Sequence, residues 1–306
     1  MFDLLGKTNI DFIGKRNVAF VLSGGLAVLG VVAVIAIATG KANLGIDFAG
    51  GTAVQLKFDR PVRIDEARQI LDKHGLSHAD LQEFRAGNKL LVRIKHPTTI
   101  QEKVANKIVT AFSSEIPDNH LAVDSSEEIG PTIGQSLQKN ALLAVGLAML
   151  GIVLYLSVRF EFRFGAAAAI ATFHDVLAVM GIVYLLNREI NLLIVTALLT
   201  LAGFSLTDKV VVFDRIRENL KARSREGLDV IINRGINQVL SRTVVVSLTV
   251  FLVLLALFFF GGEVLHDFSL ALLIGVVIGI YSSIFVASPI LFVWKGSHGK
   301  LLGRRA

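Results

Sequence analysis

The chain has 306 residues, of which 53% are hydrophobic and only 18% charged, and its net charge is +6. A mean hydropathy of +0.63 is too high for soluble domains of this length. The absence of cysteine excludes a disulfide framework and thiolate metal sites. The composition therefore indicates a membrane protein, in which basic residues report orientation rather than nucleic-acid binding.

Six apolar stretches are long enough to cross a membrane, since a helix needs about 20 residues to span a hydrocarbon core of roughly 30 Å. They are residues 18–39, 141–158, 164–186, 190–213, 243–260 and 268–294. Charged residues within them are confined to Asp175, Asp208 and Lys209. The first stretch exceeds a secretory h-region and is followed by no convincing A-x-A cleavage site, which predicts an uncleaved signal anchor.

Lysine and arginine are distributed unequally between the two sets of short loops. Not counting Arg242 at the start of the fifth stretch, fifteen lie on one side, and a single residue, Arg188, lies on the other. The positive-inside rule therefore predicts a cytoplasmic tail at 1–17 and another at 295–306. The segment 40–140 then lies outside the cytoplasm, and residues 141–294 contain the second to sixth spans.

The segment 40–140 has the pattern of a small soluble domain with a linker. Alternating apolar and polar residues predict strands, and amphipathic runs predict helices. The elements are strands at 52–58, 80–84, 89–95 and 120–126, with helices at 64–74 and 98–113. The order β-α-β-β-α-β predicts a ferredoxin-like α+β sandwich. Its histidines at positions 74, 78, 96 and 120 are scattered, so no metal site is predicted.

Two short glycine-containing motifs are present, and neither indicates an enzyme. Gly6-Lys7-Thr8 resembles the end of a phosphate-binding loop, but the glycine required five residues earlier is Met1 and no strand precedes it. We therefore predict no internal ATPase and no enzyme, with energy supplied by a partner or by the membrane. Gly275 and Gly279 form a G-x-x-x-G pattern that is typical of close helix packing.

Ionisable residues inside spans are the strongest functional signal, because an isolated charge at the bilayer centre costs at least about 2.5–3.5 kcal/mol. Asp208 lies roughly 8 Å from the cytoplasmic end of the fourth span. Arg242 would reach a similar depth if the fifth helix began near Ile236, and the two would form a site that binds and releases a proton. Two alternatives stay open: a packing ion pair, or neutralisation of Asp208 by a snorkelling Lys209.

His174 and Asp175 lie at the centre of the third span and are a candidate proton relay. Adjacent helix positions point about 100° apart, so only one of the two can face a given helix interface. A packing role is an equally open interpretation.

The chain resembles the SecF family, the smaller membrane subunits of the SecDF protein-export complex in the resistance-nodulation-division superfamily. The resemblance covers nearly the whole chain. It is carried by GIDFAGGT at 45–52, RFEFR at 159–163, HD at 174–175, SLTD at 205–208, VVFDRIREN at 211–219, LSRT at 240–243, FGGEV at 260–264 and YSSI at 281–284.

The resemblance implies six transmembrane helices, one half of a transporter of this superfamily, with a periplasmic domain between the first and second helices. It implies a multi-pass protein of the bacterial inner membrane that uses the proton-motive force to promote late steps of preprotein translocation. Implied partners are SecD as the other half, the SecYEG channel, the SecA motor, a YajC-type accessory protein and the unfolded preprotein. No nucleic acid and no cofactor are implied; the coupling ion is the proton, with sodium as an alternative.

The resemblance also assigns the proton path to Asp208 and Arg242. The local pattern departs from the family at three positions, where Phe204, Thr207 and Lys209 replace a tyrosine, an asparagine and a small or hydroxyl residue. Two other functions stay open. One is a scaffold that stabilises the translocon without moving protons, and the other is drug efflux, which the small external domain disfavours.

Overall fold

The computed structural model describes residues 8–77, 79–84, 87–95, 104–222 and 226–294. Residues 1–7 and 295–306 of the predicted tails, His78, His96 and the first part of the predicted helix 98–113 lie outside the described residues. The chain divides into two compact units. Leu44–Leu143 form an α/β unit, and the segments on either side of it together form a helical unit.

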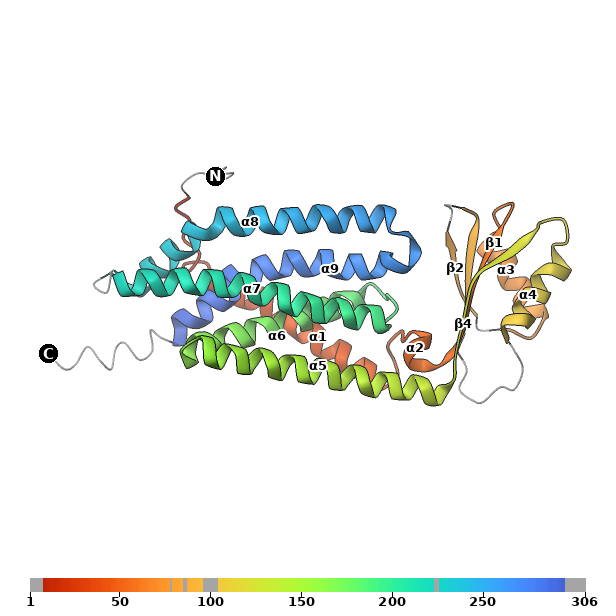
Figure 1. Cartoon of the computed structure of the whole chain (residues 1–306), viewed down its shortest axis with the longest axis horizontal. Coiled ribbons are helices and arrows are strands. Elements are labelled where there is room, and N and C mark those ends of the chain that lie inside the picture. The colour runs from red at the N-terminus through yellow and green to blue at the C-terminus, as the bar shows by residue number, and fades with distance from the viewer. Residues whose placement is uncertain (1–7, 78, 85–86, 96–103, 223–225, 295–306) are drawn as a thin grey trace. The chain divides into compact units, whose positions relative to one another are not determined.

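The α/β unit contains an antiparallel sheet of strand order β2-β3-β1-β4. Two helices, α3 and α4, lie on one face of that sheet (Figure 1). The elements are β1 (Gly51–Phe58), α3 (Ile64–Lys73), β2 (Asp80–Phe84), β3 (Lys89–Lys95), α4 (Val104–Glu115) and β4 (Leu121–Ile129). The predicted ferredoxin-like order is thus confirmed, and the predicted limits of β2 and β3 agree with the structure.

The core of this sandwich follows from the alternation of side chains along the strands. Val54 of β1 is paired in register with Val92 of β3, and both are completely buried. Ile108 and Phe112 of α4 lie in the same hydrophobic cluster, also without exposed surface. Each Å² of apolar surface that is buried stabilises the fold by about 25 cal/mol, and this burial holds the helices on the sheet.

A short helix, α2 (Ile46–Ala49), precedes β1 and was not predicted from the sequence. Gly50 and Gly51 join the two elements with φ angles of 74° and 153°. A Cβ atom at Gly51 would lie 2.4 Å from the carbonyl oxygen of Ile94, and one at Gly50 would lie 2.9 Å from Cα of Pro131. Both positions therefore require glycine, for conformation and for space.

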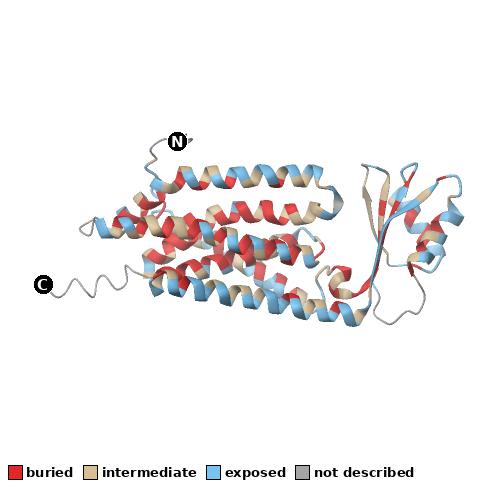
Figure 2. Cartoon of the chain, viewed as in Figure 1, coloured by how far each residue is buried: buried red, intermediate tan, exposed pale blue. Residues whose placement is uncertain are grey.

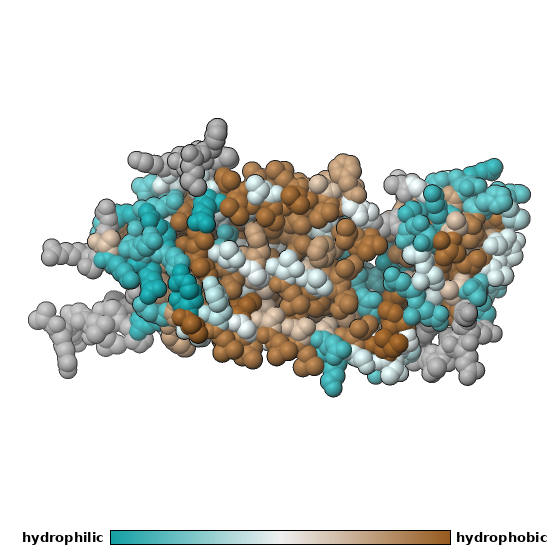
Figure 3. Space-filling model, viewed as in Figure 1, coloured by the Kyte–Doolittle hydropathy of each residue, from teal (hydrophilic) through white to brown (hydrophobic). Residues whose placement is uncertain are grey.

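The helical unit contains helices that are long and apolar enough to cross a membrane, and the chain has six of these in its described parts. They are α1 (Arg16–Ala38), α5 (Pro131–Arg159), α6 (Phe162–Leu185), α7 (Leu192–Ala222), α8 (Leu228–Phe260) and α9 (Gly262–Ser282), the last continuing through a π-helix, η1 (Ser283–Ala287), toward Trp294. The prediction of six spans is confirmed. Figure 3 shows a wide hydrophobic band across the visible face of this unit, with hydrophilic residues where α7 ends and α8 begins.

Helix α6 is central, because it packs against α1, α7 and α9. Figure 2 shows the buried residues concentrated in α6, α7 and α9 while α5 and α8 are largely exposed. Close packing of α1 on α6 depends on glycine: a Cβ at Gly30 would lie 2.3 Å from the carbonyl oxygen of Leu177. The predicted G-x-x-x-G packing is also found, with Gly275 against Leu201 and Gly279 against Ser205 of α7.

Three helices extend nine or more residues beyond the apolar stretches predicted. Helix α5 begins at Pro131 rather than 141, α7 ends at Ala222 rather than 213, and α8 begins at Leu228 rather than 243. Hydropathy detects only the part of a helix in hydrocarbon, whereas a helix continues into water wherever its side chains permit. Arg242 therefore lies inside α8, as the hypothesis for this residue required.

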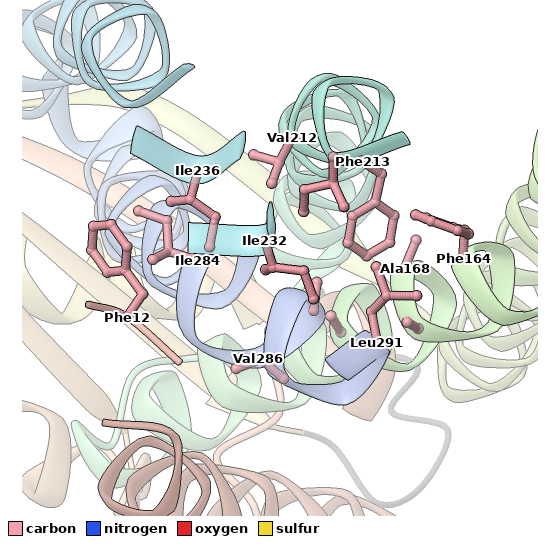
Figure 4. Packing of buried hydrophobic residues seen from close by; sticks show 14 of the residues in the cluster. Phe12, Phe164, Ala168, Val212, Phe213, Ile232, Ile236, Ile284, Val286 and Leu291 are labelled. Carbon is pink, nitrogen blue, oxygen red and sulfur yellow. The ribbon is translucent and has the colours of Figure 1, made fainter. Parts of the chain in front are cut away.

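A hydrophobic cluster joins one end of the helical unit to the N-terminal segment (Figure 4). Phe12 packs edge-on against Phe285 of η1, with ring centroids 5.5 Å apart. Two asparagines of α8 bind the backbone of this segment and form what we call the N-terminal clamp. Asn233 Oδ1 accepts hydrogen bonds from the N–H groups of Phe12 and Ile13, each at 3.0 Å.

Asn237, one helical turn further along α8, binds both backbone polar groups of a single residue, Ile10. Its Oδ1 accepts a hydrogen bond from the N–H of Ile10 at 3.0 Å, and its Nδ2 donates to the Ile10 carbonyl at 2.9 Å. Asn233 Nδ2 donates in addition to Asp11 Oδ1 at 2.7 Å. Residues 10–13 are thus fixed to the same helix that carries Arg242.

Candidate functional site: a buried charge cluster

A buried cluster of four polar side chains lies where α6, α7 and α9 meet. Lys209 Nζ is 2.6 Å from Asp175 Oδ2 and 3.0 Å from Ser282 Oγ. Ser205 Oγ hydrogen-bonds both Asp175 Oδ2 and Lys209 Nζ, and Ser282 Oγ donates to Asp175 Oδ2 at 2.7 Å. All four residues have no exposed surface. We refer to Asp175, Ser205, Lys209 and Ser282 as the Asp175 cluster.

Helix periodicity explains how the cluster forms. Ser205 and Lys209 are four residues apart on α7, so their side chains lie on the same face. Gly279 of α9 faces Ser205, where an added Cβ would lie 3.5 Å from Ser205 Oγ, and Ser282 follows Gly279 by one turn. The π-helix η1 begins directly after Ser282; single π-helical turns of this kind are frequent at functional sites.

His174 extends the cluster on the other side of the carboxylate. Its Nδ1 lies 3.0 Å from Asp175 Oδ1, so both oxygens of Asp175 are engaged. His174 is buried, and its Nε2 atom has no hydrogen-bond partner within the described parts of the chain. The structure therefore brings together both residues of the predicted relay.

Asp208 is adjacent to Lys209 in sequence but lies outside the cluster. It is 8% exposed, and within the ranges given above its Oδ2 atom has no hydrogen-bond partner. The idea that Lys209 snorkels and pairs with Asp208 was wrong, because Lys209 turns inward to Asp175. The difference follows from the roughly 100° rotation between consecutive helix positions.

The expected contact between Asp208 and Arg242 is not formed: these two described residues share neither an ion pair nor a hydrogen bond. Arg242 instead lines a cavity of about 770 Å³ between α7 and α8. Its lining residues are Val211, Asp214, Arg215, Glu218, Gln238, Val239, Ser241, Arg242, Val245 and Val246. Asp208 precedes Val211 by one turn on α7.

Helices α6 and α8 contain further buried polar atoms. Thr172 Oγ1 of α6, and Thr243 Oγ1 and Ser247 Oγ of α8, have no hydrogen-bond partner among the residues that the structure describes. Unpaired buried polar atoms are uncommon in proteins because each costs roughly 1–3 kcal/mol. Together with Asp208 Oδ2 and His174 Nε2 they provide polar groups inside an otherwise apolar helical unit.

Sequence reasoning missed Ser205, Ser282 and the true partner of Lys209. A signal was present, because Ser205 and Lys209 share a helix face and Ser282 lies three residues after Gly279 in the glycine pattern. The sequence does not state, however, which face of one helix meets which face of another. The same limit applies to the side of α7 that carries Asp208.

Comparison with known proteins agrees with this architecture. The family model "Protein export membrane protein SecD/SecF, C-terminal" matches residues 108–297, and "SecD/SecF GG Motif" matches residues 35–62. The chain is 50% identical over 295 residues to the protein translocase subunit SecF of Thermodesulfovibrio yellowstonii, covering 96% of this chain and 97% of that protein. It is 41% identical to the subunit of Endomicrobium trichonymphae over 97% of this chain and 94% of that protein.

A solved structure shares the fold. The crystal structure of SecDF, described as a translocon-associated membrane protein, from Thermus thermophilus superposes with a TM-score of 0.84 at 37% identity. The match covers 97% of this chain and 40% of that one. The chain thus spans less than half of the SecDF polypeptide.

Six apolar helices, an inserted α/β sandwich and buried charges between the spans define an integral membrane protein of transporter type. Within that class, the chain belongs to the SecF family of protein translocase subunits. The GG motif of the family corresponds to Gly50 and Gly51, whose conformation and close contacts explain why glycine stands there.

Proposed function

We propose that this subunit, paired with SecD, uses the proton-motive force to promote late steps of protein export across the bacterial inner membrane. Asp208 is the carboxylate that binds and releases the proton, and Arg242 supplies the opposing charge. His174 and Asp175 are the second buried pair and a candidate relay. The observation that carries this proposal is the Asp208 Oδ2 atom, which is buried and has no partner among the described residues.

Comparison of the two buried carboxylates favours Asp208 as the titrating group. Protonation of Asp175 would leave the Lys209 ammonium buried without a counter-charge, and breaking a buried pair costs about 3–5 kcal/mol. Protonation of Asp208 at its unpartnered oxygen breaks no ion pair. The cavity that Arg242 lines also contains Val211, which follows Asp208 by one turn, and charged side chains of α7 such as Asp214 and Glu218.

Partner and orientation follow from separate observations. The chain matches 40% of a single polypeptide that is called SecDF, which supports SecD as the partner of this chain. The excess of lysine and arginine in one set of loops supports cytoplasmic termini and a periplasmic α/β unit. SecYEG, SecA and a YajC-type protein are then the other components that this subunit assists.

The test is export of a secreted reporter in cells depleted of their own SecF and supplied with this chain or its Asp208→Asn variant. We expect Asp208→Asn to insert and pair with SecD yet to support only the export that remains after protonophore treatment. Asp229→Asn is the matched control, because Asp229 is an exposed aspartate in the first turn of α8 and does not line the cavity that contains Arg242. Full export by Asp208→Asn would reject the proton site and favour the scaffold function.

A further inference from the structure

The surroundings of the Lys209 ammonium have the composition of a cation-binding site. Nζ lies 2.6 Å from Asp175 Oδ2, 3.0 Å from Ser282 Oγ and 3.5 Å from the Ser205 carbonyl oxygen, and it hydrogen-bonds Ser205 Oγ. Every atom around it in these contacts is oxygen. The oxygens come from two helices besides the one that carries Lys209, α6 and α9, and from the preceding turn of α7.

This set of ligands is the one that a hard monovalent cation takes. Carboxylate, hydroxyl and carbonyl oxygens are the preferred ligands of hard cations. In membrane transporters, backbone carbonyls of unwound helices near the middle of the bilayer coordinate the coupling ion. One carboxylate supplies one negative charge, which balances a single positive charge and not two.

We propose that the Lys209 ammonium is a built-in cation that fills an oxygen cage formed by Asp175, Ser205 and Ser282, and that it thereby excludes sodium from the core of this subunit. Lys209 acts as a specificity-determining residue. The choice of ion rests on the proposed function: with the cage filled by a tethered ammonium, the proton at Asp208 remains as the coupling ion.

Burial makes this exclusion effective. Lys209 has no exposed surface, and fully buried lysine is rare unless it is paired. An ion that replaced the ammonium would have to expel a charge from the same low-dielectric site, since one carboxylate cannot balance two cations. The covalent tether also holds the ammonium at a high effective concentration, which a free ion cannot match.

The proposal predicts that removing the ammonium opens the cage. Lys209→Ala keeps Asp175, Ser205 and Ser282 and leaves their oxygens without a cation. We expect the purified full-length variant to bind sodium stoichiometrically and to unfold at a higher temperature in sodium chloride than in choline chloride of equal ionic strength. We expect the native protein to bind no sodium and to unfold at the same temperature in both salts.

Controls separate the cage from general salt effects. The double variant Lys209→Ala/Asp175→Asn lacks the carboxylate and should lose the sodium response, and Lys221→Ala, an exposed lysine on the same helix, should behave like the native protein. Sodium stabilisation of the native protein would overturn the proposal whether or not the variant folds. A folded Lys209→Ala variant that binds no sodium would overturn it as well, with Lys209→Gln as the second variant if Lys209→Ala does not fold.

These measurements use no export assay, so they fail or succeed independently of the proton site. An Asp208→Asn variant with full export would reject the proposed function and leave the cage intact. A sodium-binding native protein would reject the cage and leave the role of Asp208 standing.

Discussion

The Lys209 ammonium and the Asp175 carboxylate lie 2.6 Å apart on neighbouring helices, and neither side chain has exposed surface. Lys209 therefore forms its ion pair with a residue thirty-four positions earlier in the chain and not with its neighbour Asp208. The pairing separates two buried carboxylates by role: one is compensated by a permanent charge, and the other retains an oxygen with no partner in the described structure.

We expect Lys209→Met to destabilise the helical unit by about 3–5 kcal/mol, because it leaves Asp175 as an uncompensated buried charge. The double variant Lys209→Met/Asp175→Leu should recover most of that loss. The measurement is denaturant unfolding in mixed micelles, arranged as a double-mutant cycle. Simple additivity of the two single substitutions would show that the pair is not energetically coupled.

Gly30→Ala should weaken the contact between α1 and α6 by about 1–3 kcal/mol, because the added methyl group meets a backbone carbonyl that cannot move aside. Gly25→Ala, on the same helix with no atom within 4 Å of the new Cβ, is the matched control and should be neutral. Unfolding midpoints in detergent measure both variants. Equal unfolding midpoints for the two variants would show that the methyl group at position 30 is accommodated without loss of stability.

Gly51→Ala should destabilise the α/β unit by more than about 2 kcal/mol, since it combines a positive φ angle with an overlap against the Ile94 carbonyl. Gly87→Ala shares the positive φ angle but meets only the Lys89 side chain at 3.7 Å. Its loss should be smaller, about 1 kcal/mol. Hydrogen exchange of the β1 and β3 amides reports each variant, and similar protection in both would refute the steric explanation.

The α/β unit should lose stability in acid through Asp124. The hydrogen bond from Lys89, at 2.8 Å, and the charge of that lysine lower the pKa of Asp124 below its ordinary value of 3.8. A carboxylate whose pKa is lowered by folding stabilises the fold above pH 3.8, and this contribution is lost as the pH falls through the folded-state pKa. We therefore expect Asp124→Asn to flatten the dependence of unfolding temperature on pH below 3.8.

The companion variant for this titration is Lys89→Met, which removes the cause of the shift and keeps the carboxyl group. Its Asp124 should titrate at a higher pH than in the native chain when followed by carbon NMR of the side chain. An unchanged Asp124 titration in Lys89→Met would assign the lowered pKa to another neighbour, such as Gln55, which donates a hydrogen bond at 2.8 Å.

Local patterns predicted local structure well. Alternation along the chain located β2 and β3 to the residue, and hydropathy found all six spans. Hydropathy did not find the ends of α5, α7 and α8, because polar helix outside the bilayer has no apolar signature. The helical turn of α2 was missed for a related reason, since four residues are too few for any periodicity to register.

The site could be predicted only in part. Charged residues are rare inside spans, because desolvation of a charge is costly in every direction around the helix. This rarity correctly predicted that Asp175, Asp208 and Lys209 are buried. Which of them touch was not predictable, since contacts between helices depend on rotation and axial position, and one sequence gives neither. Serines carry no such penalty and are common, so Ser205 and Ser282 were not predicted as site residues, although both belong to motifs of the family.

The N-terminal clamp shows how a side chain can imitate a strand. The Asn237 amide offers an acceptor to one backbone group of Ile10 and a donor to the other, as a neighbouring peptide unit in a sheet would. Aspartate lacks the donor and leucine lacks both groups, so neither could replace it, although each has nearly the same size. These hydrogen bonds involve the backbone of Ile10 and not its side chain. The exposed side chain at this position can therefore vary while the segment stays bound to α8.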